Sequence, residues 1–377
     1  MKNSLLVILL AGISITSKAQ EKLPVYAPFN YLNNRELYLD STNHHTSFQI
    51  ELRKDTVYGL VDSASPRRSF FHRKLFREHL LEFRKPEYNV FIDFMPDFLI
   101  GASSVGNPHR NNSKVTWLNT RGVRLQANVG EKVYFETSFY ENQAALPYYL
   151  DTFARRERIV PGQGEIKSYQ NWKAFDFAYV NGLISYTPNK FLNFTLGYGN
   201  NNFIGDGYRS LLLSDIGFSY PYLRITGTLG NVQYTAMWAQ FEDLKSRNFQ
   251  QAYNDLGYAK KWGVFHYLDW NVSKKISIGL FDAVIWPDSD STGRKRGFDW
   301  TYLNPIIFLR PAEFSVGSSD NAMVGMTSKY KVSAATTIYG QLLLDEFKLK
   351  ELLKGDGWWG NKWSAQLGIK SFNVFRV

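Results

Sequence analysis

The sequence predicts an all-β fold, specifically a transmembrane antiparallel outer-membrane β-barrel with a small N-terminal helical element. Three observations predict it. The chain begins with an export leader, its hydrophobic period changes to two from Asn89 onward, and short connections alternate with long ones.

Residues 1–19 form the leader. A basic start at Lys2 precedes the uncharged apolar stretch Leu5–Ile15, and we expect cleavage after Ala19. That stretch is too short to span a bilayer, and no later one approaches the roughly 18 to 20 apolar residues of a membrane helix. The chain contains no cysteine, so we expect neither a lipid anchor at the cleavage site nor disulfides. An exported protein of this kind enters a membrane only as a barrel, which predicts an outer-membrane location.

Residues 20–87 are expected to form an N-terminal segment on the periplasmic side. Within it, Ser69–Phe83 has the pattern of a basic amphipathic helix. Its apolar residues recur at three- to four-residue spacing and its arginines lie off that row: Phe76, Leu80 and Phe83 against Arg73, Arg77 and Arg84. Pro86 is expected to end this helix.

Residues 88–377 are expected to form the barrel. In Phe191–Tyr198, apolar residues alternate with Asn193 and Thr195, as in a strand with one wet face. Comparable runs are Val123–Val129, Val133–Tyr140, Ala178–Tyr186, Leu223–Leu229, Val232–Phe241, Trp262–Trp270, Ile276–Ile285, Ala322–Tyr330, Ala334–Leu344 and Trp363–Ile369. About a dozen such runs, each near ten residues, match the length of a tilted membrane-spanning strand.

The connections between these runs alternate in length. Tight links are expected at 130–131, 188–189, 230–231, 271–274 and near 331, and long ones at 142–173, 200–220, 243–260, 287–319 and 347–361. Short periplasmic turns opposite long external loops are typical of outer-membrane barrels, whereas a soluble sandwich has no reason to keep its long loops at one end.

The chain ends at Phe375-Arg376-Val377 rather than on the terminal aromatic typical of outer-membrane strands. About a dozen strands are also fewer than a large outer-membrane barrel contains. We therefore expect a sequence truncated at its C-terminus, with a smaller barrel as the alternative.

The charge balance favours anionic partners. Forty-four Lys and Arg against 34 Asp and Glu give a formal net charge of +10, and 16% of residues are aromatic. Acidic polysaccharide or lipopolysaccharide, together with outer-membrane lipid, are the partners expected of an exported basic barrel. Nucleic acid is not expected, because the chain is exported and carries no nucleic-acid motif.

The sequence offers little for catalysis. Its six histidines include no HExxH spacing, no Gly-x-Ser-x-Gly elbow is present, and we expect no catalytic residue, no metal site and no cofactor. A glycan hydrolase using carboxylates such as Asp151, Glu157 and Glu165 is the remaining enzymatic alternative.

The long connection Pro147–Trp172 is the candidate polysaccharide-binding site. Aromatic faces stack on sugar rings and arginines fork onto carboxylates or phosphates. The residues of both kinds in this loop are Tyr148, Tyr149, Arg155, Arg156, Arg158 and Trp172. The alternative is that the aromatics belong to the interfacial girdle and the arginines contact lipopolysaccharide. For Trp358 and Trp359 the girdle is favoured.

A second motif lies at Gly205, Asp206, Gly207, Tyr208, Arg209 and Ser210, followed by Leu211-Leu212-Leu213-Ser214. The glycines permit a tight fold-back, and Asp206 with Arg209 is a candidate ion pair inside the barrel or its mouth. No Gly-Lys-Ser/Thr follows, which argues against nucleotide binding.

This motif resembles the signature of the Wzi-type capsule-assembly family, in its Bacteroidetes gliding-motility branch typified by RemB. Further matches to that branch lie at 119–122, 141–143, 147–148, 161–164 and 304–311, with Gly317 and Asn321. The resemblance implies a plugged, non-enzymatic barrel that binds or organises capsular or exopolysaccharide, or serves as a gliding adhesion component in contact with gliding or secretion machinery. The alternative is a porin or transporter for small or hydrophobic solutes, which requires an open bore.

Overall fold

The protein is described by a computed structural model. It describes residues 21–22, 38–39, 44–48, 52–53, 69–70, 74, 79–200, 202–207, 209–214, 217–247, 258–290, 292–307, 320–345, 349–355, 357, 360–372 and 374.

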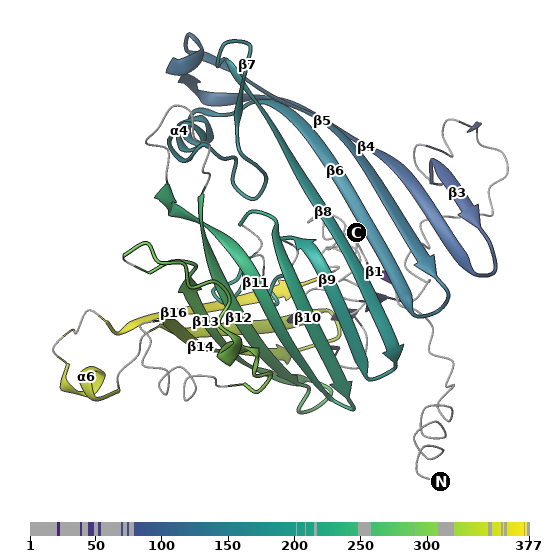
Figure 1. Cartoon of the computed structure of the whole chain (residues 1–377), viewed down its shortest axis with the longest axis vertical. Coiled ribbons are helices and arrows are strands. Elements are labelled where there is room, and N and C mark those ends of the chain that lie inside the picture. Colours follow the sequence, from purple (N-terminus) through teal and green to yellow (C-terminus); the bar gives the residue numbers. More distant parts are fainter. Residues whose placement is uncertain are drawn as a thin grey trace.

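A single antiparallel 14-stranded sheet dominates the structure. Its strands are β3 (Leu81–Arg84), β4 (Tyr88–Asn107), β5 (Ser113–Val129), β6 (Val133–Ala145), β7 (Lys167–Tyr169), β8 (Ala174–Asn189), β9 (Leu192–Gly199), β10 (Tyr220–Leu229), β11 (Val232–Arg247), β12 (Tyr258–Trp270), β13 (Ile276–Pro287), β14 (Asn321–Lys331), β15 (Thr336–Asp345) and β16 (Lys362–Ser371). Each strand pairs with the next along the chain, except that β7 pairs only with β8 and β6 pairs directly with β8. The sheet curves round on itself (Figure 1), and within the described residues no pairing joins β3 to β16.

The smaller elements lie outside this sheet. They are the strand pair β1 (Glu21–Lys22) and β2 (Leu52–Arg53), the helices α4 (Tyr148–Glu157) and α6 (Leu349–Lys354), and the short 3-10 helices η1 (Pro108–Arg110) and η2 (Trp300–Leu303). Among the described helices, none combines the length and the apolar character needed to cross a membrane.

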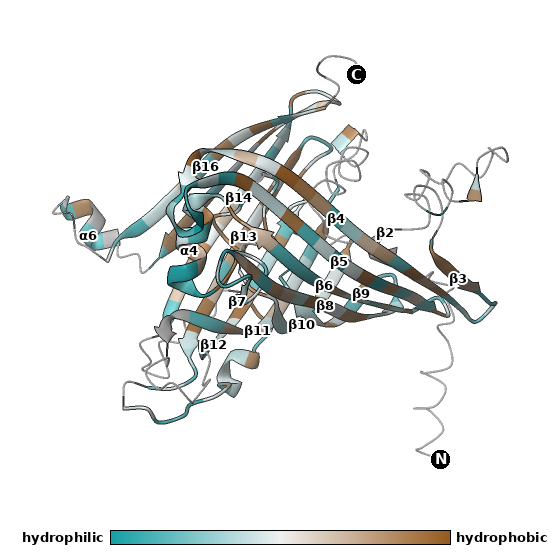
Figure 2. Cartoon of the chain, turned by 90° about the horizontal axis from the view of Figure 1, so that it is seen from above, coloured by the Kyte–Doolittle hydropathy of each residue, from teal (hydrophilic) through white to brown (hydrophobic). Residues whose placement is uncertain are grey.

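Along β5 and β9 the inner face of the sheet is polar and the outer face is apolar. On β5, Val123 and Val129 are exposed, whereas Arg124, Gln126 and Asn128 between them are buried. Figure 2 shows hydrophobic segments along the outer strands β4 to β8. A soluble protein has the opposite pattern, and an apolar exterior around a polar interior is that of an outer-membrane β-barrel. The fold is therefore a transmembrane antiparallel barrel wall, and the protein resides in the outer membrane.

The predicted alternation of connections is confirmed. Tight turns lie at residues 130–132, 230–231, 271–275 and 332–335, and the long connections lie at the opposite end of the strands. The turn predicted at 188–189 is displaced to 190–191, because Pro188 and Asn189 still belong to β8.

The predicted helix at Ser69–Phe83 is wrong at its C-terminal end. Phe70 and Lys74 are helical, but Leu81–Arg84 is strand β3, which pairs with Asn89–Ile92 of β4. Pairing with β4 satisfies the backbone hydrogen bonds of this segment. Leu81 and Phe83 both lie on the exposed outer face, where their side chains contact lipid. Pro86 lies in the hairpin turn, and the sheet begins at Leu81, ahead of the expected boundary at residue 88.

Two apolar clusters lie on opposite faces of β11–β13. The inner one joins the strand residues Met237, Tyr267 and Phe281 to Phe48 and Ile204, which come from two non-strand segments. The outer one is covered by the β13–β14 connection. There Trp238 Nε1 donates to Tyr302 O at 2.8 Å and Trp286 Nε1 to Gly297 O at 3.1 Å.

Candidate functional site

Two segments fill the inner side of the sheet near β10–β15. We call residues 44–48, together with the described residues of 202–214 in the β9–β10 connection, the lumen plug. Phe48 and Ile204 form an antiparallel bridge, and Gly205 N donates to Ser47 O at 2.5 Å. Phe48, Ile204 and Leu213 are buried against the inner cluster of the wall. The two segments therefore hold each other and the wall.

Asp206 is the polar centre of the lumen plug, with 2% of its surface exposed. It accepts hydrogen bonds from Tyr38 Oη at 2.5 Å, Thr46 Oγ1 at 2.6 Å and Ser47 Oγ at 2.7 Å. Lys329 Nζ forms an ion pair with it at 3.8 Å. Burial alone would raise the pKa of Asp206, but these lysine and hydroxyl contacts hold that pKa below its ordinary value. Asp206 is therefore an ionised carboxylate stabilised by plug and wall together.

Three wall residues clamp the lumen plug. Lys329 Nζ of β14 donates to Thr46 Oγ1 at 2.6 Å and to His44 O at 2.9 Å. Gln341 of β15 donates to Ile204 O at 2.9 Å and accepts from Leu211 N at 2.9 Å.

The third wall residue is Arg224 of β10, which donates to Asn202 Oδ1 at 2.9 Å while its guanidinium lies 5.4 Å from the Phe48 ring centroid. One arginine thus contacts both segments of the plug.

The predicted motif residues have separable roles. Gly205 has φ of 152°, which other residues rarely adopt, and an added Cβ there would lie 2.3 Å from Gln341 Nε2. An added Cβ at Gly207 would lie 2.7 Å from the Tyr339 ring, so close approach favours glycine at that position. Ser210 Oγ donates to Ile204 O. Arg209 is exposed, and the cation paired with Asp206 is Lys329 rather than the Arg209 that the sequence suggested. Tyr208 lies outside the described residues.

The predicted polysaccharide loop contains α4. Tyr148 and Tyr149 are exposed in its first turn. Arg155 is structural: its Nε donates to buried Asp151 at 2.5 Å, and another guanidinium nitrogen donates to Trp172 O at 2.6 Å. Its guanidinium also lies 5.0 Å from the Phe175 ring centroid. Arg155 therefore ties the helix to the start of β8.

Arg158 and Trp172 form the exposed part of this site. The Arg158 guanidinium lies 5.3 Å from the Trp172 ring centroid, and both side chains are exposed. The backbone of Gln170, Asn171 and Trp172 is left-handed, with φ of 50°, 55° and 63°. Such a run without glycine stores strain, and stored strain is concentrated at functional sites.

Arg156 differs from Arg158. Its Nε donates to the neighbouring Glu157 Oε1 at 2.7 Å. Of the six predicted residues, the structure thus brings Arg155, Arg158 and Trp172 into contact.

Sequence reasoning missed the residues that hold Asp206. Tyr38, Thr46 and Ser47 lie about 160 positions away in the chain, with separations of 168, 160 and 159. One signal was available, because Lys329 stands on the inward row of the predicted strand Ala322–Tyr330, where an unpaired cation is costly.

The comparisons with known proteins give remote structural likeness only. No family model matches the sequence, and no curated protein matches it. Among solved structures, the siderophore receptor PiuA from Acinetobacter baumannii has 10% identity and a TM-score of 0.34, over 76% of this chain and 47% of that one. A FadL homologue of Pseudomonas aeruginosa has 11% identity and a TM-score of 0.33, over 76% and 73%. The monoaromatic hydrocarbon channel CymD has 10% identity and a TM-score of 0.31, over 77% and 81%.

This chain spans about half the length of the siderophore receptor. The three proteins are named as a siderophore receptor, a homologue of FadL and a hydrocarbon channel. The TM-scores lie below 0.5, and the likeness carries no inference about the activity of this chain.

Proposed function

We propose that the protein is a non-enzymatic outer-membrane surface protein that holds acidic capsular or exopolysaccharide through its β6–β8 connection. The observation that supports this function is the exposed Arg158–Trp172 pair, set on a strained turn and anchored by Arg155. The occupied inner side of the sheet around Asp206 is what a plugged surface protein requires, whereas an open porin requires a clear bore.

The chemistry of the pair suits a polyuronate. The Trp172 ring presents an apolar face to a sugar ring, and the Arg158 guanidinium presents paired N–H donors to a carboxylate. Tyr148 and Tyr149 extend the aromatic surface along α4. Asp151 is buried and bound to Arg155, so this carboxylate contributes to structure at the site.

The test measures binding of the purified protein to an acidic polysaccharide, alginate, and to neutral dextran. We expect saturable binding to alginate only. Arg158→Ala should weaken it about tenfold through loss of a charge-assisted contact, and Trp172→Ala about tenfold through loss of the aromatic face. Lys132→Ala, in the exposed β5–β6 turn at the other end of the strands, is the matched loss of a cation and is expected to change affinity less than about twofold. Equal losses in Arg158→Ala and Lys132→Ala, with no loss in Trp172→Ala, would show attraction by net charge alone and would reject the site.

A second candidate is a conduit for small solutes that the lumen plug closes. It is favoured by the polar inner wall of β5 and β6, where Gln126 donates to Glu136 at 3.2 Å, and by the noncovalent attachment of the plug in a chain without cysteine. Planar-bilayer recordings separate the two. Channel openings recorded from the unmodified protein would support a conduit that the plug opens and closes, and would contradict the permanently plugged surface protein.

A further inference from the structure

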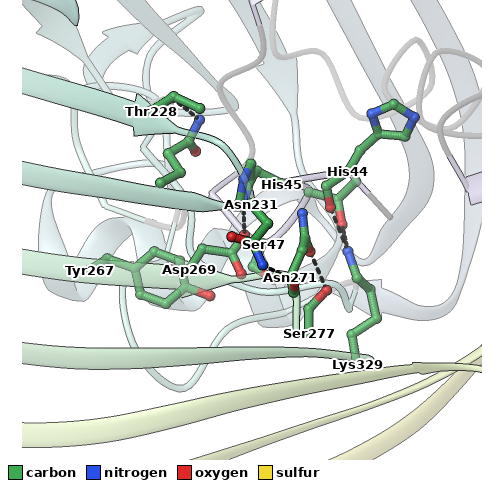
Figure 3. A network of polar contacts seen from close by, with 12 residues as sticks. His44, His45, Ser47, Thr228, Asn231, Tyr267, Asp269, Asn271, Ser277 and Lys329 are labelled. Carbon is green, nitrogen blue, oxygen red and sulfur yellow. Dashed lines mark hydrogen bonds and ion pairs between the residues drawn. The ribbon is translucent and has the colours of Figure 1, made fainter. Parts of the chain in front are cut away.

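A cavity of about 340 Å³ lies at the end of the strands that carries the tight turns. Its wall combines the lumen plug with the β10–β11 and β12–β13 turns. The lining residues are His44, His45, Gly230, Asn231, Asn271, Ser273 and Lys274. Figure 3 shows His45, Asn231 and Asn271 gathered from different parts of the chain, with the His44 ring directed away from them.

The cavity is built on fixed side chains. Asn231 Nδ2 donates to Asn271 O at 2.9 Å, Asn271 N donates to Asn231 O at 2.8 Å, and Ser277 Oγ donates to Asn271 Oδ1 at 2.5 Å. These bonds lock the two turns together. His45 Nδ1 is 3.0 Å from Asp269 Oδ2, so the imidazole donates to that buried carboxylate and is held in one orientation.

The seven lining residues include two imidazoles and one ammonium group and no carboxylate. Asp269 stands behind His45 and is itself buried. The amides and the hydroxyl of the remaining lining residues are suited to sugar hydroxyls, and the cationic and imidazole N–H groups are suited to an anionic group. The volume falls at the lower end of the range for small-molecule sites.

We propose that this cavity is a periplasmic binding site for a phosphate-bearing, sugar-sized ligand, with Lys274 and His45 on the phosphate. It lies at the opposite end of the strands from Arg158 and Trp172, so it does not rest on the glycan proposal.

The position of the site couples it to the lumen plug. His44 and His45 belong to the plug, whereas Asn231, Asn271 and Lys274 belong to the wall. Lys329 donates to His44 O and Thr46 Oγ1, which joins the cavity directly to the Asp206 network. A ligand that contacts both parts binds only while the plug is seated, and it therefore stabilises the seated state by mass action.

The first experiment is calorimetric titration of the detergent-solubilised protein with glucose 6-phosphate and, separately, with glucose. We expect saturable binding of the phosphate ester only, weakened about tenfold by Lys274→Gln. Lys275→Gln removes the same charge from the next residue of the turn, which does not line the cavity, and is expected to stay within about twofold of the parent. No saturable binding, or equal weakening by both variants, would overturn the site.

The second experiment distinguishes a soluble ligand from a lipid headgroup. The protein in nanodiscs with phosphatidylglycerol is compared with the protein in nanodiscs of phosphatidylcholine alone. If the anionic lipid competes with glucose 6-phosphate, and Lys274→Gln abolishes the competition, a lipid phosphate is an occupant of the same site. If glucose 6-phosphate binds equally well in both kinds of nanodisc, the result would support a soluble ligand.

The third experiment tests the coupling. The chain has no cysteine, so Ser47→Cys places a single thiol in the buried plug. At a ligand concentration about ten times Kd, maleimide labelling is expected to slow about tenfold, because only the unliganded protein opens. An unchanged labelling rate despite saturable binding would overturn the coupling.

Discussion

At the scale of single residues, Asp206 is the group on which the lumen plug depends most. It is buried among three hydroxyl donors and Lys329. Replacing Asp206 by Asn keeps its shape but leaves Lys329 without its anion. Removing one partner of a buried ion pair leaves the other as an uncompensated buried charge. We therefore expect Asp206→Asn to lower the free energy of unfolding by about 3 kcal/mol. Urea unfolding followed by tryptophan fluorescence measures this loss.

The same carboxylate predicts a pH dependence. The pKa of Asp206 is lower in the folded protein than its ordinary value of 3.8, so its stabilisation is present in full above that value. It is lost as the pH falls below 3.8 through the lower folded-state pKa. We expect the parent protein to lose stability over this acid range more steeply than Asp206→Asn. Glu131→Gln, at an exposed carboxylate in the β5–β6 turn, is the control that should follow the parent, and identical acid profiles for Asp206→Asn and the parent would contradict this role.

At the scale of elements, the turn between β7 and β8 carries the clearest backbone strain. Gln170 has φ of 50°, in a region where a side chain costs energy and glycine does not. We expect Gln170→Gly to raise the free energy of unfolding by about 1 kcal/mol. Lys173→Gly, just beyond the left-handed run, should lower it or leave it unchanged. Thermal melts of the two variants compare them, and stabilisation by both or by neither would show that the left-handed run is not strained.

Elements also differ in how far the sequence determines them. The strands were predictable because polar residues that face the interior, such as Thr195, alternate with apolar residues that face lipid, such as Leu196. Each strand carries this pattern in its own sequence. Leu81–Arg84 was mispredicted because Leu80 and Phe83 also fit a helical period, and only pairing with β4 decides between the two.

The candidate sites divide in the same way. Arg158 and Trp172 were predictable because they lie in one loop. Tyr38 and Thr46 were not, because their contact with Asp206 depends on how the N-terminal segment enters the barrel.

At the scale of the whole molecule, the space around two glycines predicts which substitution displaces the lumen plug. Gly207 lies in the plug where an added Cβ would meet the rigid Tyr339 ring at 2.7 Å, whereas Gly217, in the same connection, has open space around that position. We expect Gly207→Ala to unseat the lumen plug and Gly217→Ala to leave it in place. With the thiol of Ser47→Cys as reporter, the first variant should react with maleimide at least about tenfold faster than the second, since a shift of 1.4 kcal/mol in seating changes the open population tenfold.

Both variants change one glycine to the same residue, so any general effect of alanine on folding is shared between them. If the plug were a loosely attached segment, Tyr339 would yield and the two variants would label at equal rates. If the plug is one body clamped by Gln341, Arg224 and Lys329, displacement at Gly207 must also release Ser47, because Gly205 and Ser47 are joined by a backbone hydrogen bond. Faster labelling at Ser47 from a change at Gly207 therefore measures the cooperativity of the plug itself.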